Sequence, residues 1–441
     1  MRNLLYILIV FLSVAGFNRA IAVPAVQPPD AQEWLLKDEP PLLIQVKAPQ
    51  TVFAPVAGVM QGVAELNPSH GFYIYPMKGD YRELQFGNDR GFIENSGLST
   101  KKPKTIPPLD TLNELNNPIY DYLITTKDTD IFGAPDESKP PVATLFDDLR
   151  YPVLAKMVRE NREGDKIVWL TIRLADRLAY VRLSDVELDK GIPILTYHHI
   201  LKESENKNFL HTSTTTSVEA FQAQMDYLKR NGYRTLSLDD VAGYLKKENN
   251  LPGKVVILTF DDGLKSVYRY AYPILKRNNQ HAALFVISSR VKSKMQKWAP
   301  DGLQFMNWAE LLASRDIFDI QSHAHFLHRL DKRKNPIIFS RTEHSILLDY
   351  QRSQRVLEKL NPEQHYLAYP FGAYNQDAMD AAAQAEMTLA VTTIQGKVRL
   401  GDNPYALKRL YALRTDSIEK FASMIGNSGP EVVNTDIIVD K

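Results

Sequence analysis

The sequence predicts an α/β protein, a distorted (β/α) barrel in the C-terminal half preceded by one or two small all-β domains. After residue 191, continuous apolar runs alternate with amphipathic helical patterns, which is typical of a parallel sheet covered by helices. That stretch has about 240 residues, a length that suits a closed or nearly closed barrel. Before it, short Val, Ile, Tyr and Phe runs alternate with Gly, Pro, Asn and Asp, as in all-β domains.

Composition excludes several classes of function. The chain has 441 residues with 53 Lys and Arg against 52 Asp and Glu, so no strong net charge would attract nucleic acid. It has no cysteine, which excludes disulfides, thiolate metal sites, cysteine nucleophiles and iron–sulfur clusters. At roughly 100–200 residues per domain, the length predicts two to three domains.

Residues 1–22 have the pattern of a signal peptide. Arg2 supplies a positive charge, an apolar run follows at residues 4–16, and Ala-Ile-Ala at residues 20–22 is a small-x-small cleavage site. The alternative is an uncleaved membrane anchor. In either case we expect the rest of the chain outside the cytoplasm, periplasmic or secreted. Residues 23–41 are Pro-rich and are predicted to be a linker.

Residues 42–190 are predicted to form β-structure in two similar stretches. Each stretch ends in a short aromatic strand, and a Lys- and Pro-rich connector at residues 101–110 separates them. On this pattern, residues 42–100 and 111–190 resemble two small β-barrels of the bacterial Src homology 3-like type. The alternative is one irregular β domain. The resemblance implies that the barrels bind a cell-envelope glycan.

The elements of the second half are predicted in order. Strand 192–197 precedes an amphipathic helix over 217–231, and Ser237 is predicted to cap the next helix. In a β/α barrel the chemistry lies at the carboxyl ends of the strands, so we expect candidate residues there. The remaining predicted elements are strands 255–260, 283–287, 318–321 and 366–369, a helix at 347–360, a domain limit at 191–430 and a C-terminal tail at 431–441.

Two adjacent carboxylates, Asp261 and Asp262, follow the strand 255–260 and precede Gly263. Buried like charges repel, and a metal ion bound to one carboxylate would remove that cost. The other carboxylate could then serve as a base. The alternative is a solvated turn in which an aspartate caps the following helix.

Three histidines lie within six residues after the strand 318–321, namely His323, His325 and His328. Neutral imidazole is a common metal ligand, and two histidines with one carboxylate and open positions are typical of a hydrolytic zinc site. The pattern therefore indicates a metal site. It leaves open which two of the three histidines bind the metal.

Two further strand ends carry candidate residues. His198 follows the strand 192–197 and could act as a general acid, or it could be a satisfied core histidine. Strand 366–369 ends at Tyr369 and runs into Pro370, Phe371 and Gly372. Pro and Gly fix a turn in which the Phe371 N–H could point into the site as an oxyanion donor, although the same residues also make an ordinary turn.

Residues 192–425 resemble the polysaccharide deacetylases of the NodB-homology class, carbohydrate esterase family 4. The run Thr-Phe-Asp-Asp-Gly at residues 259–263 matches the first motif of that family. The resemblance implies that Asp261 is the catalytic base. It implies one divalent metal, zinc first and otherwise nickel, cobalt or iron, held by Asp262, His323 and His328.

Two further features of the sequence are similar to those of one branch of this family, which deacetylates poly-β-1,6-N-acetylglucosamine. Four residues separate His323 from His328, a longer gap than the common one, and a Tyr-His pair ending at His198 opens the domain. The usual C-terminal Leu-x-His motif is absent, because no histidine follows His365. The resemblance therefore implies that His198 is the general acid. It also implies an oxyanion or substrate role for Tyr369, Pro370, Phe371 and Gly372.

The chain departs from the family at two positions. Ala324 stands where Ser or Thr usually follows the first metal histidine, and Ala368 stands where the third motif has Arg. Another residue must then orient Asp261, and Arg409 is the candidate. We expect metal-dependent N-deacetylation of an N-acetylglucosamine polysaccharide, with release of acetate. The alternatives are a peptidoglycan N-acetylglucosamine deacetylase and a non-catalytic glycan-binding protein.

Overall fold

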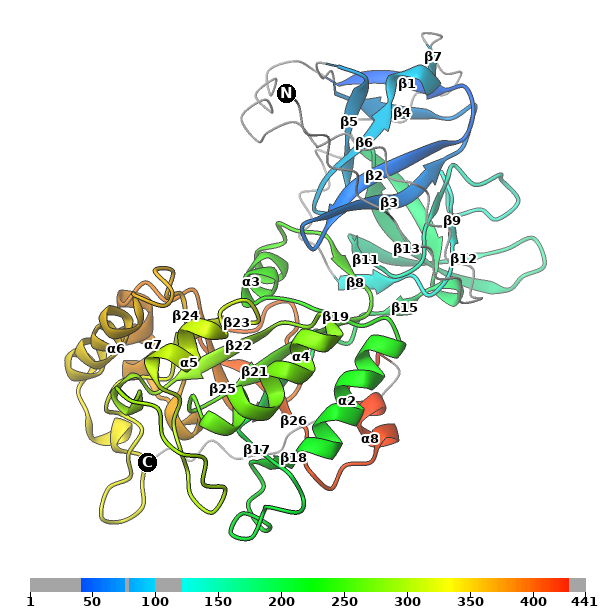
Figure 1. Ribbon diagram of the computed structural model, residues 1–441. Coiled ribbons are helices and arrows are strands. Elements are labelled where there is room, and N and C mark those ends of the chain that lie inside the picture. Colours follow the sequence, from blue (N-terminus) through cyan, green and yellow to red (C-terminus); the bar gives the residue numbers. More distant parts are fainter. Residues whose placement is uncertain (1–40, 76–78, 100–120, 428–441) are drawn as a thin grey trace, which may run out of the picture.

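The computed structural model describes residues 41–75, 79–99 and 121–427 (Figure 1). The expected signal peptide, nearly all of the linker, the connector at 101–110 and the tail at 431–441 lie outside the described residues. Among the described residues, none of the helices is both long enough and apolar enough to cross a bilayer.

The N-terminal part consists of short strands, as the sequence predicts. Their buried residues alternate with more exposed ones in strands such as β14 (Arg177–Arg182), so one face of the sheet packs inward. The other strands are β1 (Leu42–Val46), β2 (Gln50–Val56), β3 (Val59–Leu66), β4 (Gly71–Ile74), β5 (Tyr81–Phe86), β6 (Asp89–Glu94), β7 (Leu98–Ser99), β8 (Asp121–Ile124), β9 (Thr129–Ile131), β10 (Ala143–Leu145), β11 (Leu149–Val153), β12 (Ala155–Glu160), β13 (Lys166–Leu174) and β15 (Glu187–Leu188).

The described strands of the two expected barrels are joined in one sheet. One nine-stranded sheet contains strands of both expected barrels, because β10 pairs with β3 and β13 pairs with β5. Val63 and Leu84 from the first stretch share one hydrophobic cluster with Leu145 and Leu170 from the second. The alternative of one irregular β domain therefore fits the described residues better. Strand-and-turn periodicity looks the same in both arrangements, since it does not specify which strands pair.

The C-terminal part is a closed barrel of parallel strands, which confirms the predicted fold class. Strands β16, β26, β25, β24, β23, β22 and β21 pair in that order, and β16 also pairs with β21. Helices cover the barrel in Figure 1. The elements are β16 (Ile194–Tyr197), β17 (His199–Leu201), β18 (Thr215–Ser217), α2 (Val218–Arg230), β19 (Arg234–Thr235), α3 (Leu238–Lys246), β20 (Leu251–Pro252), β21 (Val255–Phe260), α4 (Tyr272–Asn278), β22 (Ala282–Val286), α5 (Trp308–Ala313), β23 (Phe318–Ser322), α6 (Glu343–Leu357), β24 (Tyr366–Ala368), α7 (Gln376–Gln384), β25 (Leu389–Gln395), β26 (Leu407–Tyr411) and α8 (Ile418–Ile425).

Alternate residues of the barrel strands belong to two hydrophobic clusters. Leu258 of β21 shares a cluster with Phe221 and Met225 of α2, whereas Ile257 shares one with Val241 of α3. Strands buried on both faces read as continuous apolar runs, which is why the sequence pattern predicted them. The strand β21 is buried along its whole length.

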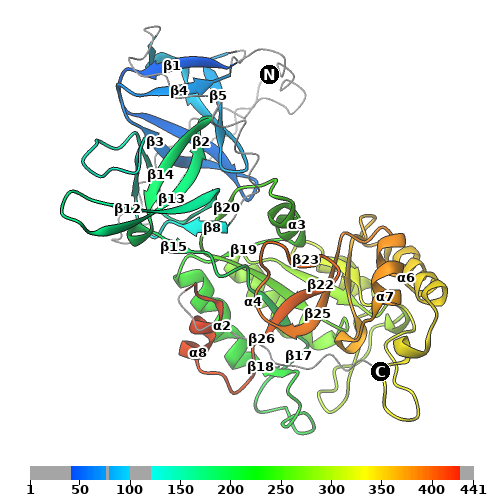
Figure 2. The same ribbon diagram turned by 180° about the vertical axis from the view of Figure 1, so that it is seen from behind.

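The two parts of the chain share a sheet. Strand β20, which lies between barrel elements in the sequence, pairs with β11 of the N-terminal part through Leu149 and Pro252. The resulting sheet has the order β15-β8-β11-β20, and Figure 2 shows β8, β15 and β20 where the β domain meets the barrel. The parts before and after residue 191 therefore have different folds, but strand pairing joins them.

Candidate active site

The adjacent carboxylates after β21 face different partners. Asp262 and Gly263 both have left-handed backbones, with φ of 72° and 70°. A Cβ on Gly263 would lie 3.2 Å from the Val286 side chain, so space favours glycine there as well. Because the backbone turns at Asp262, Asp261 is directed to Arg409 and Asp262 to the histidines.

Asp261 forms a buried bidentate ion pair with Arg409. The distances are 2.8 Å from Nη1 to Oδ1 and 2.7 Å from Nη2 to Oδ2. Burial alone would raise the pKa of Asp261, but the charge and hydrogen bonds of Arg409 outweigh it and hold that pKa at about 2. The carboxylate therefore stays ionised at neutral pH. Arg409 orients Asp261, as the sequence analysis suggested from the absence of an arginine at Ala368.

Asp262, His323 and His328 form the cluster that could hold a metal ion. Their ligand atoms all lie within 4.8 Å of one another. Asp262 Oδ1 is 3.1 Å from Nε2 of His328 and 3.6 Å from Nε2 of His323. Burial opposes ionisation of Asp262, but contact with the two histidines outweighs it and holds its pKa well below the usual range.

The donor set of this cluster fits a divalent metal. Nδ1 of His323 lies 2.7 Å from the Ala368 carbonyl oxygen. That oxygen can only accept, so Nδ1 carries the proton and Nε2 presents its lone pair to the cluster. Burial lowers the pKa of His323 to about 4, which keeps the ring neutral. Asp262 Oδ1 is buried without a hydrogen-bond donor among the described residues, as expected of an atom that binds a cation.

His325 does not join the cluster. Its Nδ1 lies 2.8 Å from the Ser288 hydroxyl, and its ring packs against Phe326. Among the described residues, His323 and His328 are the only histidines in the cluster that could hold a metal ion. The geometry thus selects one pair where the sequence pattern left three possible pairs.

His198 lies on the Asp261 side of the site. Its Nε2 is 3.7 Å from Asp261 Oδ2, and its ring lies parallel to that of Tyr411 at 6.4 Å. Its Nδ1 has no hydrogen-bond partner within the described part of the chain. The neighbouring His199 is buried against Phe209, and burial lowers the pKa of His199 to about 4. His198 is therefore the histidine of this pair that lies beside the carboxylate.

The turn after β24 places one aromatic side chain at the site. Phe371 has a left-handed backbone with φ of 59°, is 41% exposed, and its ring centroid lies 4.2 Å from that of His328. Gly372 is also left-handed, and a Cβ there would lie 2.1 Å from the Thr393 hydroxyl oxygen. Tyr369 and Pro370 are buried, and the Tyr369 hydroxyl donates to the Tyr405 carbonyl. These two residues therefore support the turn.

Sequence reasoning missed the groups that hold the histidine loop. Asp349 of α6 accepts hydrogen bonds from the backbone of His325 and Phe326, and Arg290 donates to the carbonyl of His328. No motif marks these residues, because they lie about 20 or more residues from the atoms they bond and only the fold brings them together. Helical periodicity could show only which face of α6 is buried.

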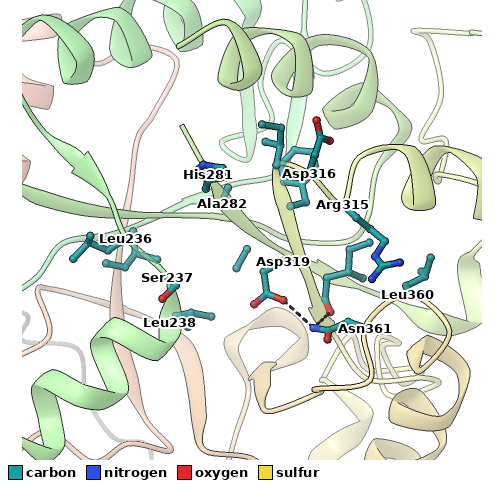
Figure 3. Close-up of a pocket in the computed structure, with 15 residues that line it drawn as sticks. Leu236, Ser237, Leu238, His281, Ala282, Arg315, Asp316, Asp319, Leu360 and Asn361 are labelled. Carbon is teal, nitrogen blue, oxygen red and sulfur yellow. Dashed lines mark hydrogen bonds between the residues drawn. The ribbon is translucent and has the colours of Figure 1, made fainter. Parts of the chain in front are cut away.

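A separate pocket lies at the opposite end of the barrel. It has a volume of about 340 Å³ and is lined by the amino-terminal ends of β22 and β23 and the start of α3. Figure 3 shows Asp319 and Asn361 hydrogen-bonded to one another there, at 2.8 Å. None of the predicted site residues lines this pocket.

Comparison with known proteins supports the resemblance stated from the motifs. Residues 248–390 match the family model described as polysaccharide deacetylase. The chain is 26% identical over 227 residues to the poly-beta-1,6-N-acetyl-D-glucosamine N-deacetylase of Staphylococcus aureus strain MSSA476, covering 49% of this chain and 77% of that protein.

Two solved structures are also similar to the chain. One is the Streptococcus pyogenes deacetylase PplD in complex with acetate, at 27% identity, 54% of this chain, 99% of that chain and a TM-score of 0.46. The other is IcaB from Ammonifex degensii, at 27% identity, 54% of this chain, 97% of that chain and a TM-score of 0.46. The Asp261–Asp262 pair and the histidine cluster lie within residues 248–390, so this part of the chain is a polysaccharide deacetylase domain.

Proposed function

We propose that this protein removes acetyl groups from an N-acetylglucosamine polymer of the poly-β-1,6 type, with the help of one divalent metal. The observation that carries the proposal is the Asp262, His323 and His328 cluster beside the Asp261–Arg409 ion pair. The substrate class is supported by the similarity to the poly-beta-1,6-N-acetyl-D-glucosamine N-deacetylase of Staphylococcus aureus. The wide gap between His323 and His328 and the position of His198 favour the same class.

Asp262, His323 and His328 would hold the metal. Zinc suits one carboxylate oxygen and two imidazole nitrogens, and the same ligands accept nickel, cobalt or iron. When bound, the cation would act as a Lewis acid and make water more acidic. The protein's own contribution is to orient the imidazole of His323 through its hydrogen bond to the Ala368 carbonyl, while burial keeps that ring neutral.

Asp261 and His198 are proposed to move the protons. Asp261 takes a proton from the water that attacks the acetamide carbon, and Arg409 keeps this carboxylate ionised and in a fixed orientation. When the carbon–nitrogen bond breaks, His198 gives a proton to the leaving amine. Acetate and a glucosamine residue result. The N–H of Phe371 is proposed as a donor to the negative oxygen that develops during the attack.

The location of the protein is also a proposal. The first 22 residues have a positively charged start, a short apolar run and a small-x-small cleavage site. We therefore propose that the protein acts in the periplasm or outside the cell. A role of the N-terminal β domain in glycan binding is proposed on its position ahead of the deacetylase domain.

The proposal is tested by acetate release from a panel of substrates. The panel contains β-1,6 and β-1,4 N-acetylglucosamine oligomers and peptidoglycan, each with and without a chelator. We expect the fastest release from the β-1,6 oligomers and its loss with the chelator, restored by added metal. Faster release from peptidoglycan would instead identify the cell wall as substrate. No release from any of them, with metal added, would favour a glycan-binding protein.

A further inference from the structure

The segment that connects the two metal-type histidines has few backbone bonds of its own. It begins at Ser322, the last residue of β23, and Ala324 within it has a left-handed backbone with φ of 61°. A residue with a Cβ adopts this conformation only when its surroundings hold it there. The position of His328 relative to His323 therefore depends on groups outside the segment.

Helix α6 holds the N–H groups of this segment. Oδ1 of Asp349 accepts from the N–H of His325 at 2.8 Å, and Oδ2 accepts from the N–H of Phe326 at 2.7 Å. One turn further along the same helix, Ser353 accepts a hydrogen bond from the Ser322 hydroxyl at 2.9 Å. Both oxygens of Asp349 are thus used on two consecutive amides, which a neutral side chain of the same size cannot match.

A second element holds the carbonyl groups of the same segment. The residues 288–290 form a short 3₁₀ turn after β22. The Ser288 N–H donates to the Ala324 carbonyl at 3.2 Å, and the Ser289 hydroxyl donates to that of His325. Arg290 Nη2 donates to the carbonyl of His328 at 2.9 Å. The histidine segment is therefore fixed from both sides, by donors on one and acceptors on the other.

We propose that Asp349 is a positioning residue for the metal site, an inference that rests on the proposed metal-dependent function. It acts through the backbone between His323 and His328 and does not touch the cluster. Ala324 has no hydroxyl that could hydrogen-bond to the segment. The conformation of the segment therefore depends more strongly on the carboxylate of Asp349. Outer groups that orient metal ligands typically change metal affinity or activity about 10–100-fold when they are removed.

The test is metal binding by the full chain with Asp349→Ala and Asp349→Asn. Zn²⁺ is titrated into metal-free protein against a chromophoric chelator, and the thermal midpoint is measured with and without Zn²⁺. We expect Asp349→Ala to weaken binding about 10–100-fold. Asp349→Asn should weaken it less, because one amide keeps an oxygen acceptor. Glu358→Gln, which removes the same charge at the exposed end of α6, is the matched control and should bind as the wild type does.

Kinetics separate positioning from a purely structural role. If Asp349 positions the ligands, saturating Zn²⁺ should restore most of kcat in Asp349→Asn with little change in KM. A structural role would lower the thermal midpoint of the metal-free protein and leave the Zn²⁺ affinity within about twofold, and that result would overturn the inference. Wild-type protein that binds no Zn²⁺ would overturn the proposed function itself. Wild-type binding that Asp349→Ala retains in full would overturn only the inference.

Discussion

The left-handed backbone at Asp262 explains how two neighbouring carboxylates take different tasks. With φ of 72°, it turns Asp262 to the histidines while Asp261 stays paired with Arg409. Each carboxylate then has an opposite or polar partner, so the repulsion expected between adjacent buried charges is relieved. Gly263 allows the chain to continue in the same unusual conformation.

Arg409→Lys tests whether the bidentate pair sets the state of Asp261. Lysine keeps the charge but lacks the planar fork, so it cannot hold both carboxylate oxygens. We expect the pKa of Asp261 to rise and the acidic limb of the kcat/KM profile to move to higher pH. Activity near neutral pH should fall by roughly 10–100-fold, as for other groups that support a reacting residue. Lys408→Arg, the neighbouring residue whose partner is Asp402 at 2.9 Å, is the control and should leave the profile unchanged.

The choice between His325 and His328 is tested by metal content. His328 is 3.1 Å from Asp262, whereas His325 is hydrogen-bonded to Ser288. We expect His328→Ala to lose the metal, measured by elemental analysis of the purified protein. His325→Ala should keep most of it and at least a tenth of the activity. Equal loss of metal in both variants would contradict the assignment.

The roles of Asp261 and His198 are separated by the leaving group. An aryl acetate ester can expel a phenolate without a proton, whereas an amine must be protonated to leave. His198→Ala should therefore be much slower on N-acetylglucosamine oligomers than on the ester. Asp261→Asn should keep its metal and be slower on both, by about 10²–10⁴ in kcat. Equal losses on amide and ester would leave His198 as a structural or substrate-binding residue.

At this scale, the sequence was informative wherever reactive residues follow a buried strand. Asp261, His198 and His323 could be found in this way, because parallel strands bring their carboxyl ends together. The sequence could not choose between His325 and His328, since that choice depends on backbone angles near Ala324. Asp349 could not be found at all, because its partners are hydrogen-bond donors of the backbone and carry no sequence signal.

At the scale of elements, strands buried on both faces were the most predictable. The observed β21 coincides with the predicted strand 255–260, because it is an apolar run ended by polar residues, and β23 extends the predicted strand 318–321 by one residue. Strands β25 and β26 were not predicted. In β26, the run Leu-Lys-Arg-Leu-Tyr contains two charged residues, and Arg409 is buried only because Asp261 pairs with it. Pairing with a distant charge is invisible to local periodicity.

Asp319 of β23 lies at the end of the barrel opposite the site. Its ionisation should make the stability of the protein depend on pH. Burial raises the pKa of Asp319 from its usual value of 3.8 to about 6. Between these values the folded state binds more protons than the unfolded state, so the free energy of unfolding falls as pH rises through that window. Asp319→Asn lacks this effect. The stability of the wild type relative to Asp319→Asn should therefore decrease as pH rises from about 4 to about 7.

The measurement for Asp319 is chemical denaturation of both proteins at several pH values. The difference between them cancels the contribution of the other titrating groups, apart from those that interact with Asp319, namely Asp239, Glu363 and His365. Asp301→Asn, which removes a carboxylate from an exposed loop, is the control. A difference that stays constant over this range would show that Asp319 is ionised to the same extent in both states.

At the scale of the whole molecule, a change in the sequence pattern did not mark the start of an independent domain. The pattern changes near Gly191, where short strands give way to alternating strands and helices. Yet Leu251 and Pro252 of the barrel extend a sheet of the β domain, and Asn250 bonds to residues 86 and 88. Such contacts connect segments more than 100 residues apart, so periodicity could not predict them. We therefore expect the deacetylase domain to depend on the β domain for stability.

A buried ion pair at this junction provides the test of that dependence. Arg150 of β11 bonds to Asp189 at 2.9 Å, and the two side chains are 2% and 1% exposed. Arg150 also donates to the Pro252 carbonyl of β20 at 2.8 Å. Arg150→Met would leave the charge of Asp189 buried without its partner. We expect this variant to lose about 3–5 kcal/mol of the free energy of unfolding, measured by denaturant titration.

The double variant Arg150→Met with Asp189→Leu shows the origin of that loss. It removes both charges, so the uncompensated burial of Asp189 disappears and the protein should be more stable than Arg150→Met alone. Arg159→Met on the exposed strand β12 is the control, expected within about 0.5 kcal/mol of the wild type. Because the pair joins the β domain to the barrel, loss of deacetylase activity should follow the same denaturant transition as loss of the β-domain signal from Trp169. Two separate transitions in the wild type would show that the barrel folds without the β domain.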